Sequence, residues 1–342
     1  MRSRPLRLRP LGAERAGAVW DPGITITGGR AGNAAGRVVV TTQIAPAVER
    51  LIGNTPLVGL HRLVPPGAGR VVVKLEYQNP SGSVKDRPAL AIIRAAERDK
   101  RLHQGLVLLD ASSGNTAIGY AMLCAARRYG CEICLPGSAS PAHQAVLRSY
   151  DTTMVITDPL EGSDGAIREA QRRAARWPER YFYADQYNNP ENVNAHYETT
   201  AVEIWRQTHG RVTHLVAALG TSGTLVGTGR RLRELNPGIR LVAVQPDSPL
   251  HGIEGVKHMA TAIVPGIYDP ALADATFIVT TEAAQATARR LVQDERLRSG
   301  ASGGANVAAA LLVAEEAGPD ALVVTLIPDG GEPHLAERFR AA

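Results

Sequence analysis

The sequence lacks any long apolar run. Over its 342 residues, no stretch approaches the roughly 18 consecutive apolar residues that a membrane-spanning helix needs. Residues 1–20 also lack the continuous apolar segment of a secretory signal. No internal repeat is visible either. We therefore expect a cytoplasmic globular protein, in which 44% hydrophobic residues allow two compact cores.

Cysteine is scarce, with only Cys124, Cys131 and Cys134 in the chain. The two-residue spacing between the last two would suit a metal or redox pair. However, CEICLP is an apolar run ended by Pro136 and Gly137, which is typical of a buried strand. Residues three apart on a strand point to opposite faces. We therefore expect buried structural thiols and no metal site.

Net charge is confined to one end of the chain. Residues 1–37 contain seven arginines against Glu14 and Asp21, which accounts for the whole formal charge of +5. A neutral body argues against a nucleic-acid partner. The composition of residues 1–45 predicts a disordered basic tail, with an organelle-targeting segment as the alternative.

Short apolar runs alternate with helical patterns along most of the sequence, as in RVVVKLEY followed by DRPALAIIRAAERDK and LVLLDA followed by NTAIGYAMLCAARRYG. This alternation predicts an α/β fold with parallel sheets covered by helices. In such folds, binding sites collect at the loops beyond the carboxyl ends of the strands. Three of these loops contain residue types that could serve in catalysis or ligand binding.

The first loop follows the apolar run at 71–76 and spans residues 79–87, NPSGSVKDR. Ser83 and Asp86 have the spacing of a capping box, which places Lys85 in the first turn of a helix. Its amine would lie near unpaired N–H groups and the positive end of the helix dipole. This fits either a solvated surface lysine or a Schiff-base lysine, because positive surroundings and burial help an amine to lose its charge.

The second loop, residues 110–116, reads DASSGNT and precedes a helix expected to begin near Asn115 or Thr116. Its hydroxyls, amide and free N–H groups could bind a carboxylate at the helix N-terminus. The same residue types also serve as ordinary caps and turns, so both interpretations stay open.

The third loop, GTSGT at residues 220–224, opens another helical pattern. Its glycines allow close backbone approach to a phosphate, and Thr221, Ser222 and Thr224 add hydroxyl donors. A dinucleotide site is the rival interpretation, with Asp247 as a ribose-binding acid. The strict G-x-G-x-x-G spacing is absent, which weakens that rival.

In this order and spacing, the loops resemble motifs of the cysteine synthase and cystathionine β-synthase branch of pyridoxal-phosphate enzymes. IGNTPLVGL at 52–60 and DQYNNPENVNAHYETTAVEIW at 185–205 resemble further family segments. The resemblance spans roughly residues 46–335. It implies fold type II, similar to the tryptophan synthase β subunit.

That fold consists of two three-layer αβα domains with parallel sheets. The resemblance implies a large cofactor-binding domain at 46–78 and 190–342, after the tail at 1–45. It implies a small, mobile substrate-binding domain at 79–189.

Residue by residue, the resemblance implies one site for pyridoxal 5′-phosphate (PLP). Lys85 would form the Schiff base, Asn115 would contact the phenolic oxygen, and Ser302 would hydrogen-bond the pyridine nitrogen. The phosphate would be held by Gly220, Thr221, Ser222, Gly223 and Thr224. The substrate carboxylate would be bound by Ser112, Ser113, Thr116 and Gln186. A neutral hydroxyl at the pyridine nitrogen keeps the ring a weaker electron sink, which favours early loss of a β-substituent.

The implied reaction is β-replacement on an activated serine, O-acetylserine or O-phosphoserine, through an α-aminoacrylate. Sulfide would be the nucleophile and L-cysteine the product, in a cysteine synthase that works as a homodimer. Alternatives are an amine or carrier-bound sulfur as nucleophile with O-phosphoserine, or cystathionine β-synthase activity. A binding or regulatory paralogue is a further alternative, against which the intact Lys85, Asn115 and Ser302 argue.

Lys257 leads to a prediction of which activated serine the protein uses. A phosphate dianion entering a neutral pocket needs a cation, whereas an acetyl ester does not. We therefore predict that Lys257 binds the phosphate of O-phosphoserine, with a solvated loop residue as the alternative.

Three positions depart from the family pattern. Ser222 stands where many relatives have glycine, Gly303 follows Ser302 where a second serine is usual, and Ala117 replaces a common glycine. None removes a group with an expected catalytic role, so we expect activity to be retained.

Overall fold

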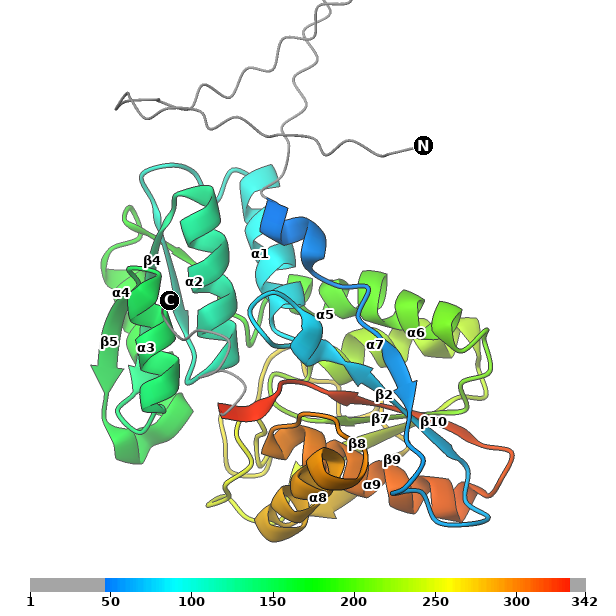
Figure 1. Cartoon of the computed structure of the whole chain (residues 1–342). Helices are drawn as coiled ribbons and strands as arrows, with labels where there is room; N and C mark the ends of the chain where they lie inside the picture. Colours follow the sequence, from blue (N-terminus) through cyan, green and yellow to red (C-terminus); the bar gives the residue numbers. More distant parts are fainter. Residues whose placement is uncertain (1–46, 333–342) are drawn as a thin grey trace, which may run out of the picture. The chain divides into compact units, whose positions relative to one another are not determined.

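The computed structural model describes residues 47–332, so the predicted basic tail at 1–45 lies outside the described residues. Two sheets organise them (Figure 1). The strands are β1 (Leu57–Gly59), β2 (Arg70–Leu75), β3 (Val107–Ala111), β4 (Gly130–Pro136), β5 (Thr153–Thr157), β6 (Tyr181–Tyr183), β7 (His214–Ala218), β8 (Arg240–Pro246), β9 (Ala275–Val279) and β10 (Leu322–Ile327).

Nine α-helices lie within the described residues: α1 (Asp86–Arg98), α2 (Asn115–Arg127), α3 (Pro141–Ser149), α4 (Gly162–Arg176), α5 (Pro190–Ala195), α6 (Ala201–Gln207), α7 (Gly223–Leu235), α8 (Thr281–Asp294) and α9 (Ala301–Ala317). Short 3₁₀ turns lie at η1 (Ala47–Leu51), η2 (Glu76–Gln78) and η3 (Pro159–Glu161), and a π-helical turn, η4 (His196–Thr200), follows α5. Within residues 47–332, no helix is both long and apolar enough to cross a membrane.

The large lobe is built on the six-stranded sheet, in the order β1-β2-β10-β7-β8-β9. Its strands are parallel except β1, which pairs antiparallel with β2. All six residues of the central strand β10, LVVTLI, are buried, as expected for a strand covered on both faces. One core lies between the sheet and α8 and α9, and another lies between the sheet and α5 to α7 (Figure 1).

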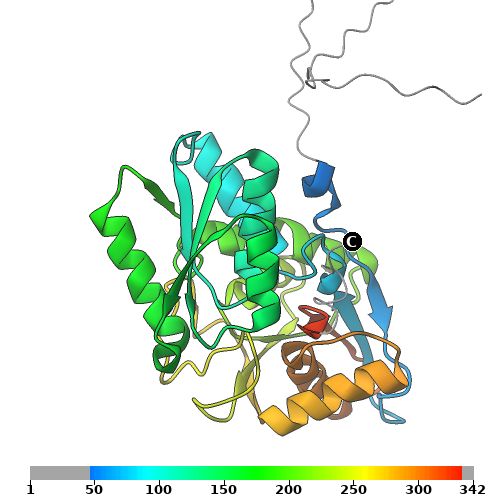
Figure 2. The ribbon, with the colours of Figure 1, turned by 60° about the vertical axis from the view of Figure 1, so that its left-hand side comes forward.

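The small lobe is built on the four-stranded sheet, which is entirely parallel in the order β5-β4-β3-β6. α1, α2 and α3 pack on one face, and α4 covers the other (Figure 2). α1 is amphipathic: Ala89, Ile92, Ile93 and Ala96 are fully buried at helical spacing, against the small-lobe core. The expected α/β class with two sheets, each between layers of helices, is confirmed.

The predicted buried strand around the cysteines is β4. Cys131 packs in the core beneath α2, and Cys134 packs in the core beneath α4, so the two thiols diverge as expected. All three cysteines are free and buried. A hydrogen bond with Cys124 and burial raise the pKa of Cys131 well above its usual value, and burial raises the pKa of Cys134 to about 12. Neutral thiols of this kind are poor nucleophiles and poor metal ligands.

Candidate active site

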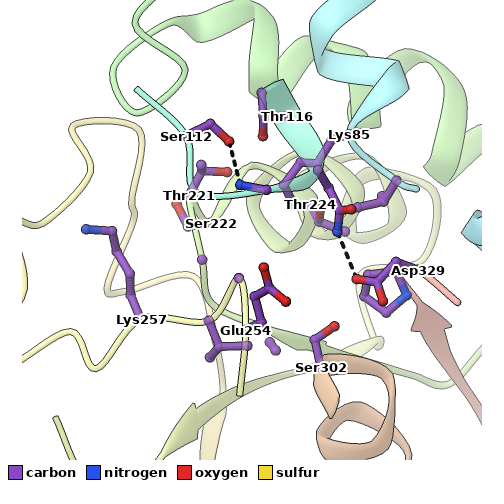
Figure 3. A pocket seen from close by; sticks show the side chains of 18 of the residues that line it. Lys85, Ser112, Thr116, Thr221, Ser222, Thr224, Glu254, Lys257, Ser302 and Asp329 are labelled. Carbon is purple, nitrogen blue, oxygen red and sulfur yellow. Dashed lines mark hydrogen bonds between the residues drawn. The ribbon is translucent and has the colours of Figure 1, made fainter. Parts of the chain in front are cut away.

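One pocket collects most of the residues that the sequence predicted (Figure 3). Of the thirteen predicted site residues, twelve line it: Lys85, Ser112, Ser113, Asn115, Thr116, Gln186, Gly220, Thr221, Ser222, Thr224, Lys257 and Ser302. The thirteenth, Gly223, is the first residue of α7, directly after the lining residue Ser222. The pocket is therefore formed by loops after β3, β6, β7, β8 and β10 together with the start of α1, as expected at the carboxyl ends of parallel strands.

Lys85 is the residue immediately before α1. Burial lowers the pKa of its amine, while the negative charges of Asp329 and Glu76 act in the opposite direction. A lysine whose neutral form is favoured can attack a carbonyl or accept a proton. The structure thus favours the chemical interpretation of Lys85 over that of a solvated surface lysine.

The predicted capping box at the start of α1 is wrong in detail. The Ser83 hydroxyl accepts a hydrogen bond from the backbone N–H of Lys85 (3.2 Å), two residues on. Asp86 turns back instead to Ser81, whose N–H and hydroxyl both donate to its carboxylate. The loop is also attached to the large lobe, because the Val84 N–H donates to the Pro328 carbonyl (2.8 Å). These contacts give Lys85 a fixed backbone position.

A buried network of charges lies directly behind this loop. The Arg87 guanidinium donates to both carboxylate oxygens of Glu76 and to both of Glu203, at 2.7–2.8 Å. Lys74 pairs with Glu203 at 2.7 Å and donates to the Thr55 carbonyl at 2.6 Å. Burial alone would raise the pKa of Glu76, but Arg87 and Lys74 lower it to about 2. Two positive and two negative charges therefore compensate one another, and we call these four residues the buried ion network.

The predicted substrate loop opens α2, which begins at Asn115. The Ser112 hydroxyl accepts hydrogen bonds from the N–H groups of Gly114 (3.3 Å) and Ala117 (3.2 Å). Thr116 donates to the side-chain oxygen of Gln186 (2.8 Å). Together these contacts bring four predicted carboxylate-binding residues to the N-terminus of one helix, where unpaired N–H groups attract an anion.

Asp110 holds this loop in place through hydrogen bonds. Its carboxylate accepts hydrogen bonds from the N–H groups of Ala111 (2.8 Å) and Gln186 (3.2 Å), and the Gln186 amide donates back to the Ala111 carbonyl (2.7 Å). Complete burial raises the pKa of Asp110 to about 7 despite these bonds. The sequence analysis assigned Asp110 no role, although its place directly before the SSGNT motif could have drawn attention to it.

The third loop forms a cradle with free donors. Ser222 has φ 70°, in the left-handed region that favours glycine, and its buried hydroxyl has no partner among the described residues. A Cβ at Gly220 would collide with the Gly255 carbonyl, and one at Gly223 would collide with Asn192, so the backbone packs too closely for side chains. Asn192 donates to the Thr221 hydroxyl at 3.0 Å. Free N–H groups at the start of α7 complete an anion site.

His196, which the sequence analysis missed, supports this cradle from behind. Its ring nitrogens lie 2.9 Å from the Thr200 hydroxyl and 3.3 Å from the Thr224 hydroxyl. Burial and the nearby Arg87 lower its pKa to about 3, so the imidazole is neutral at ordinary pH. A neutral ring can accept from one hydroxyl and donate to the other, which holds Thr224 in place.

The predicted pyridine-nitrogen partner, Ser302, lies in the first turn of α9 and lines the pocket. The neighbouring departure from the family pattern has a steric reason, because a Cβ at Gly303 would overlap the Ser299 hydroxyl and crowd Ile327. Ser299 itself donates to the Gly300 carbonyl at 2.9 Å. A second serine after Ser302 would therefore require the Ser299 hydroxyl to rotate away and Ile327 to give slightly.

Lys257 lines the pocket, but its charge is compensated. Its ammonium donates to Asp164 at 2.9 Å and to the Ile263 carbonyl at 3.3 Å, and it lies 5.0 Å from the centre of the Tyr187 ring. Asp164 belongs to α4 of the small lobe, and Lys257 belongs to the loop between β8 and β9 of the large lobe. The pair joins the two lobes. Lys257 would have to leave Asp164 before it could make the predicted contact with a substrate phosphate.

The residues present suit the cofactor that the resemblance implies. An unpartnered Ser222 hydroxyl in a glycine-rich turn at a helix N-terminus suits a phosphate, and the buried Lys85 amine suits an aldehyde. The Ser302 hydroxyl suits a neutral ring nitrogen. One pocket thus has a partner for the phosphate, the aldehyde and the ring nitrogen of PLP.

Comparisons with known proteins agree with this geometry. A family model described as pyridoxal-phosphate dependent enzyme matches residues 48–329. A cysteine synthase of Aquifex aeolicus is 44% identical over 294 residues, which cover 84% of this chain and 90% of that protein. Cysteine synthase B of Escherichia coli is 40% identical over 289 residues, covering 84% of this chain and 94% of that protein.

Solved structures of related enzymes are also similar to this chain. A cysteine synthase from Entamoeba histolytica superposes with TM-score 0.79 at 32% identity, covering 92% of this chain and 95% of that one. An O-ureido-L-serine synthase gives TM-score 0.79 at 34% identity, covering 86% and 96%. The chain therefore belongs to the cysteine synthase branch of the pyridoxal-phosphate dependent enzymes, and its cofactor is pyridoxal 5′-phosphate.

Proposed function

We propose that this chain is a cysteine synthase, which replaces the β-substituent of an activated serine with sulfide. The observation that carries the proposal is the convergence of the buried Lys85 amine, the 220–224 cradle and the SSGNT loop on one pocket. Three of the four named relatives are cysteine synthases, which supports the same reaction.

The roles of the residues follow from their positions. The 220–224 cradle would hold the phosphate, Asn115 the phenolic oxygen and Ser302 the pyridine nitrogen. When bound, the cofactor supplies an electron-withdrawing ring that stabilises negative charge at the substrate Cα. Lys85, whose neutral form is favoured by burial, would take the proton from Cα and later return one.

The substrate carboxylate would bind at the N-terminus of α2. Ser112, Ser113 and Thr116 lie there, and Gln186 is held against the loop by Thr116 and Ala111. This anchoring would aim Cα at the Lys85 amine, because it fixes the carboxylate within the pocket that the amine lines. Closure of the small lobe, residues 79–189, on the large domain at 46–78 and 190–342 would exclude water from the reacting atoms.

The donor that the pocket suits best is O-acetylserine. A neutral ester needs no additional cation, and Lys257 is already paired with Asp164. Sulfide as nucleophile, a homodimeric assembly and a cytoplasmic location, all expected from the sequence, complete the proposal.

A direct assay tests the proposal. Purified protein loaded with PLP should form L-cysteine from O-acetylserine and sulfide, quantified by mass spectrometry. O-acetylserine alone should change the visible absorption of the loaded protein. If the loaded protein shows neither the spectral change nor the product, while a control cysteine synthase shows both, then the proposed function is wrong.

A further inference from the structure

Asp329 is a pocket residue that no motif in the sequence marked. It follows β10 and lines the pocket together with Ser302 and Lys85 (Figure 3). Its two carboxylate oxygens have different partners: one accepts from the Asn115 amide at 2.9 Å, and the other accepts from the Gly331 N–H at 3.0 Å. Its own carbonyl accepts from the Gly300 N–H (3.1 Å), just before α9. The carboxylate is thus held in a fixed orientation.

The bond to Asn115 fixes a group that would otherwise have two orientations. A carboxylate only accepts hydrogen bonds, so the amide nitrogen of Asn115 must face Asp329 and its oxygen must point away. Asn115 begins α2 of the small lobe, whereas Asp329 ends the central strand of the large lobe. The contact therefore also links the two walls of the pocket beside the cofactor position.

The charge of Asp329 acts on Lys85 without compensation. Two acids raise the pKa of Lys85 against the effect of burial, Asp329 and Glu76. Glu76 is fully engaged by Arg87 and belongs to the buried ion network. His196, on the other side, is neutral. Asp329 has no cationic partner among the ion pairs of the described residues, so its negative charge dominates the field at the amine.

We propose that Asp329 is a positioning residue of this site, which orients the Asn115 amide and places a negative charge beside the Lys85 amine. This inference rests on the proposed function, because it gives Asn115 and Lys85 their roles toward PLP. Two parts can be separated: the hydrogen bond needs only an acceptor oxygen, whereas the electrostatic effect needs the charge.

Three variants distinguish the two parts. Asp329→Asn removes the charge and keeps one acceptor oxygen, which can face Asn115 if the bond from the Gly331 N–H is given up, and Asp329→Ala removes the charge and both acceptors. Glu332→Gln is the matched control, because it removes an acid from the same segment that is exposed and does not act on Lys85. Thermal unfolding of each apo-protein establishes that it is folded.

The first measurement uses apo-protein without PLP. The rate at which an amine-specific acylating reagent labels Lys85 is followed against pH by mass spectrometry, because only the neutral amine reacts. Asp329→Asn and Asp329→Ala should both lower the pKa of Lys85, so that labelling below that pKa is about tenfold faster, equivalent to one pKa unit. Glu332→Gln should match the wild type. Unchanged labelling in both Asp329 variants would overturn the electrostatic part.

The second measurement is the affinity of each apo-protein for PLP. Asp329→Ala should bind at least about tenfold more weakly, corresponding to about 1.4 kcal/mol, while Asp329→Asn should stay close to the wild type. Equal affinity of a folded Asp329→Ala variant would overturn the positioning part. Failure of the proposed function would look different, since wild-type protein would then make no cysteine even though Asp329 still affects Lys85 labelling.

Discussion

Two groups of charged residues flank the start of α1, one fully buried and one in the pocket, and they differ in how completely their charges are paired. In the buried ion network, Arg87 bridges two carboxylates and Lys74 reinforces one of them. In the pocket, Lys85 has no ion-pair partner within residues 47–332, and the acids Asp329 and Glu254 lie in the wall. Only two positions along the chain separate Lys85 from Arg87, so neighbouring residues serve opposite purposes.

The difference in pairing explains the difference in chemistry. Each charge in the network has a nearby opposite charge, which fixes its ionisation and makes it structural. Among the described residues, Lys85 lacks this compensation, so partial burial lowers its pKa toward neutrality. Groups of this second kind can exchange protons at ordinary pH.

The largest expected effect comes from removing the pocket amine. Lys85→Ala should lower kcat/KM for cysteine formation by at least about 10⁴-fold, or roughly 5 kcal/mol, because both cofactor attachment and proton transfer are lost. Chemical denaturation of the apo-protein should show unchanged or slightly higher stability, since an unpaired buried amine is removed. A borohydride-reducible bond to PLP at a different lysine would refute the assignment.

Breaking the buried ion network should instead lower the stability of the protein. Arg87→Met leaves two buried carboxylates without their partner, so the free energy of unfolding should fall by about 3–5 kcal/mol in urea denaturation. Arg94→Met is the control, because Arg94 lies on the same helix with its side chain 52% exposed, and its partner Glu49 keeps a second arginine, Arg127. A difference below about 1 kcal/mol between the two variants would contradict the comparison.

Sequence patterns predicted much of this arrangement for a physical reason. The α/β class follows from the alternation of apolar runs and helical patterns, and the three loops follow from local motifs near residues 85, 115 and 222. The buried ion network could not be predicted this way, because Arg87 meets Glu203 across 116 positions of the chain. Asp329 was missed for the same reason: its partner Asn115 is 214 positions away.

Charges also explain where local reasoning gave the wrong detail. The Ser83 and Asp86 spacing predicted a capping box, yet Asp86 bonds to Ser81. Lys257 was predicted to bind a substrate phosphate or to be a solvated loop residue, and Asp164, 93 positions away, pairs with its ammonium. In both cases an alternative partner competes for the side chain, and the spacing of residues in a motif does not report that partner.

The pH dependence of stability should separate paired from unpaired acids. Asp110, beneath the pocket, has a folded pKa raised to about 7, above its unfolded value near 3.9. The folded state therefore binds more protons between these values, and stability falls as pH rises from about 4 to 7. Asp110→Asn should remove this slope in urea titrations at several pH values. An identical slope in the variant would show that Asp110 is ionised throughout.

The contribution of Glu76 to stability should change with pH in the opposite direction. Its folded pKa of about 2 lies below the unfolded value, so its contribution is present above about pH 4.3 and is lost as pH falls toward 2. The same titrations, extended to acid, should show this loss in the wild type and in Asp110→Asn alike. If the free energy of unfolding of the wild type does not fall at acid pH, the pairing inferred for Glu76 is wrong.

A smaller effect is expected at the pair that joins the lobes. Asp164→Asn removes the negative charge that compensates Lys257, which then becomes available to a phosphate. We expect kcat/KM for O-phosphoserine to rise about tenfold, or about 1.4 kcal/mol, with O-acetylserine changed little. Adding Lys257→Ala should cancel the gain. Equal changes for both donors would mean that the pair serves closure of the lobes and leaves donor choice unaffected.

The smallest expected effect concerns the strained residue of the cradle. Ser222 has φ 70°, and its hydroxyl is buried without a partner, so both features cost stability in the apo-protein. Ser222→Ala removes the hydroxyl and keeps the strain, whereas Ser222→Gly removes both. Glycine should therefore be more stable than alanine by about 1 kcal/mol in chemical denaturation of apo-protein. Both variants should bind PLP more weakly by a similar factor, since each lacks the hydroxyl donor. If alanine and glycine are equally stable, the backbone at this position carries no strain; if both keep wild-type affinity, the hydroxyl does not contact the phosphate.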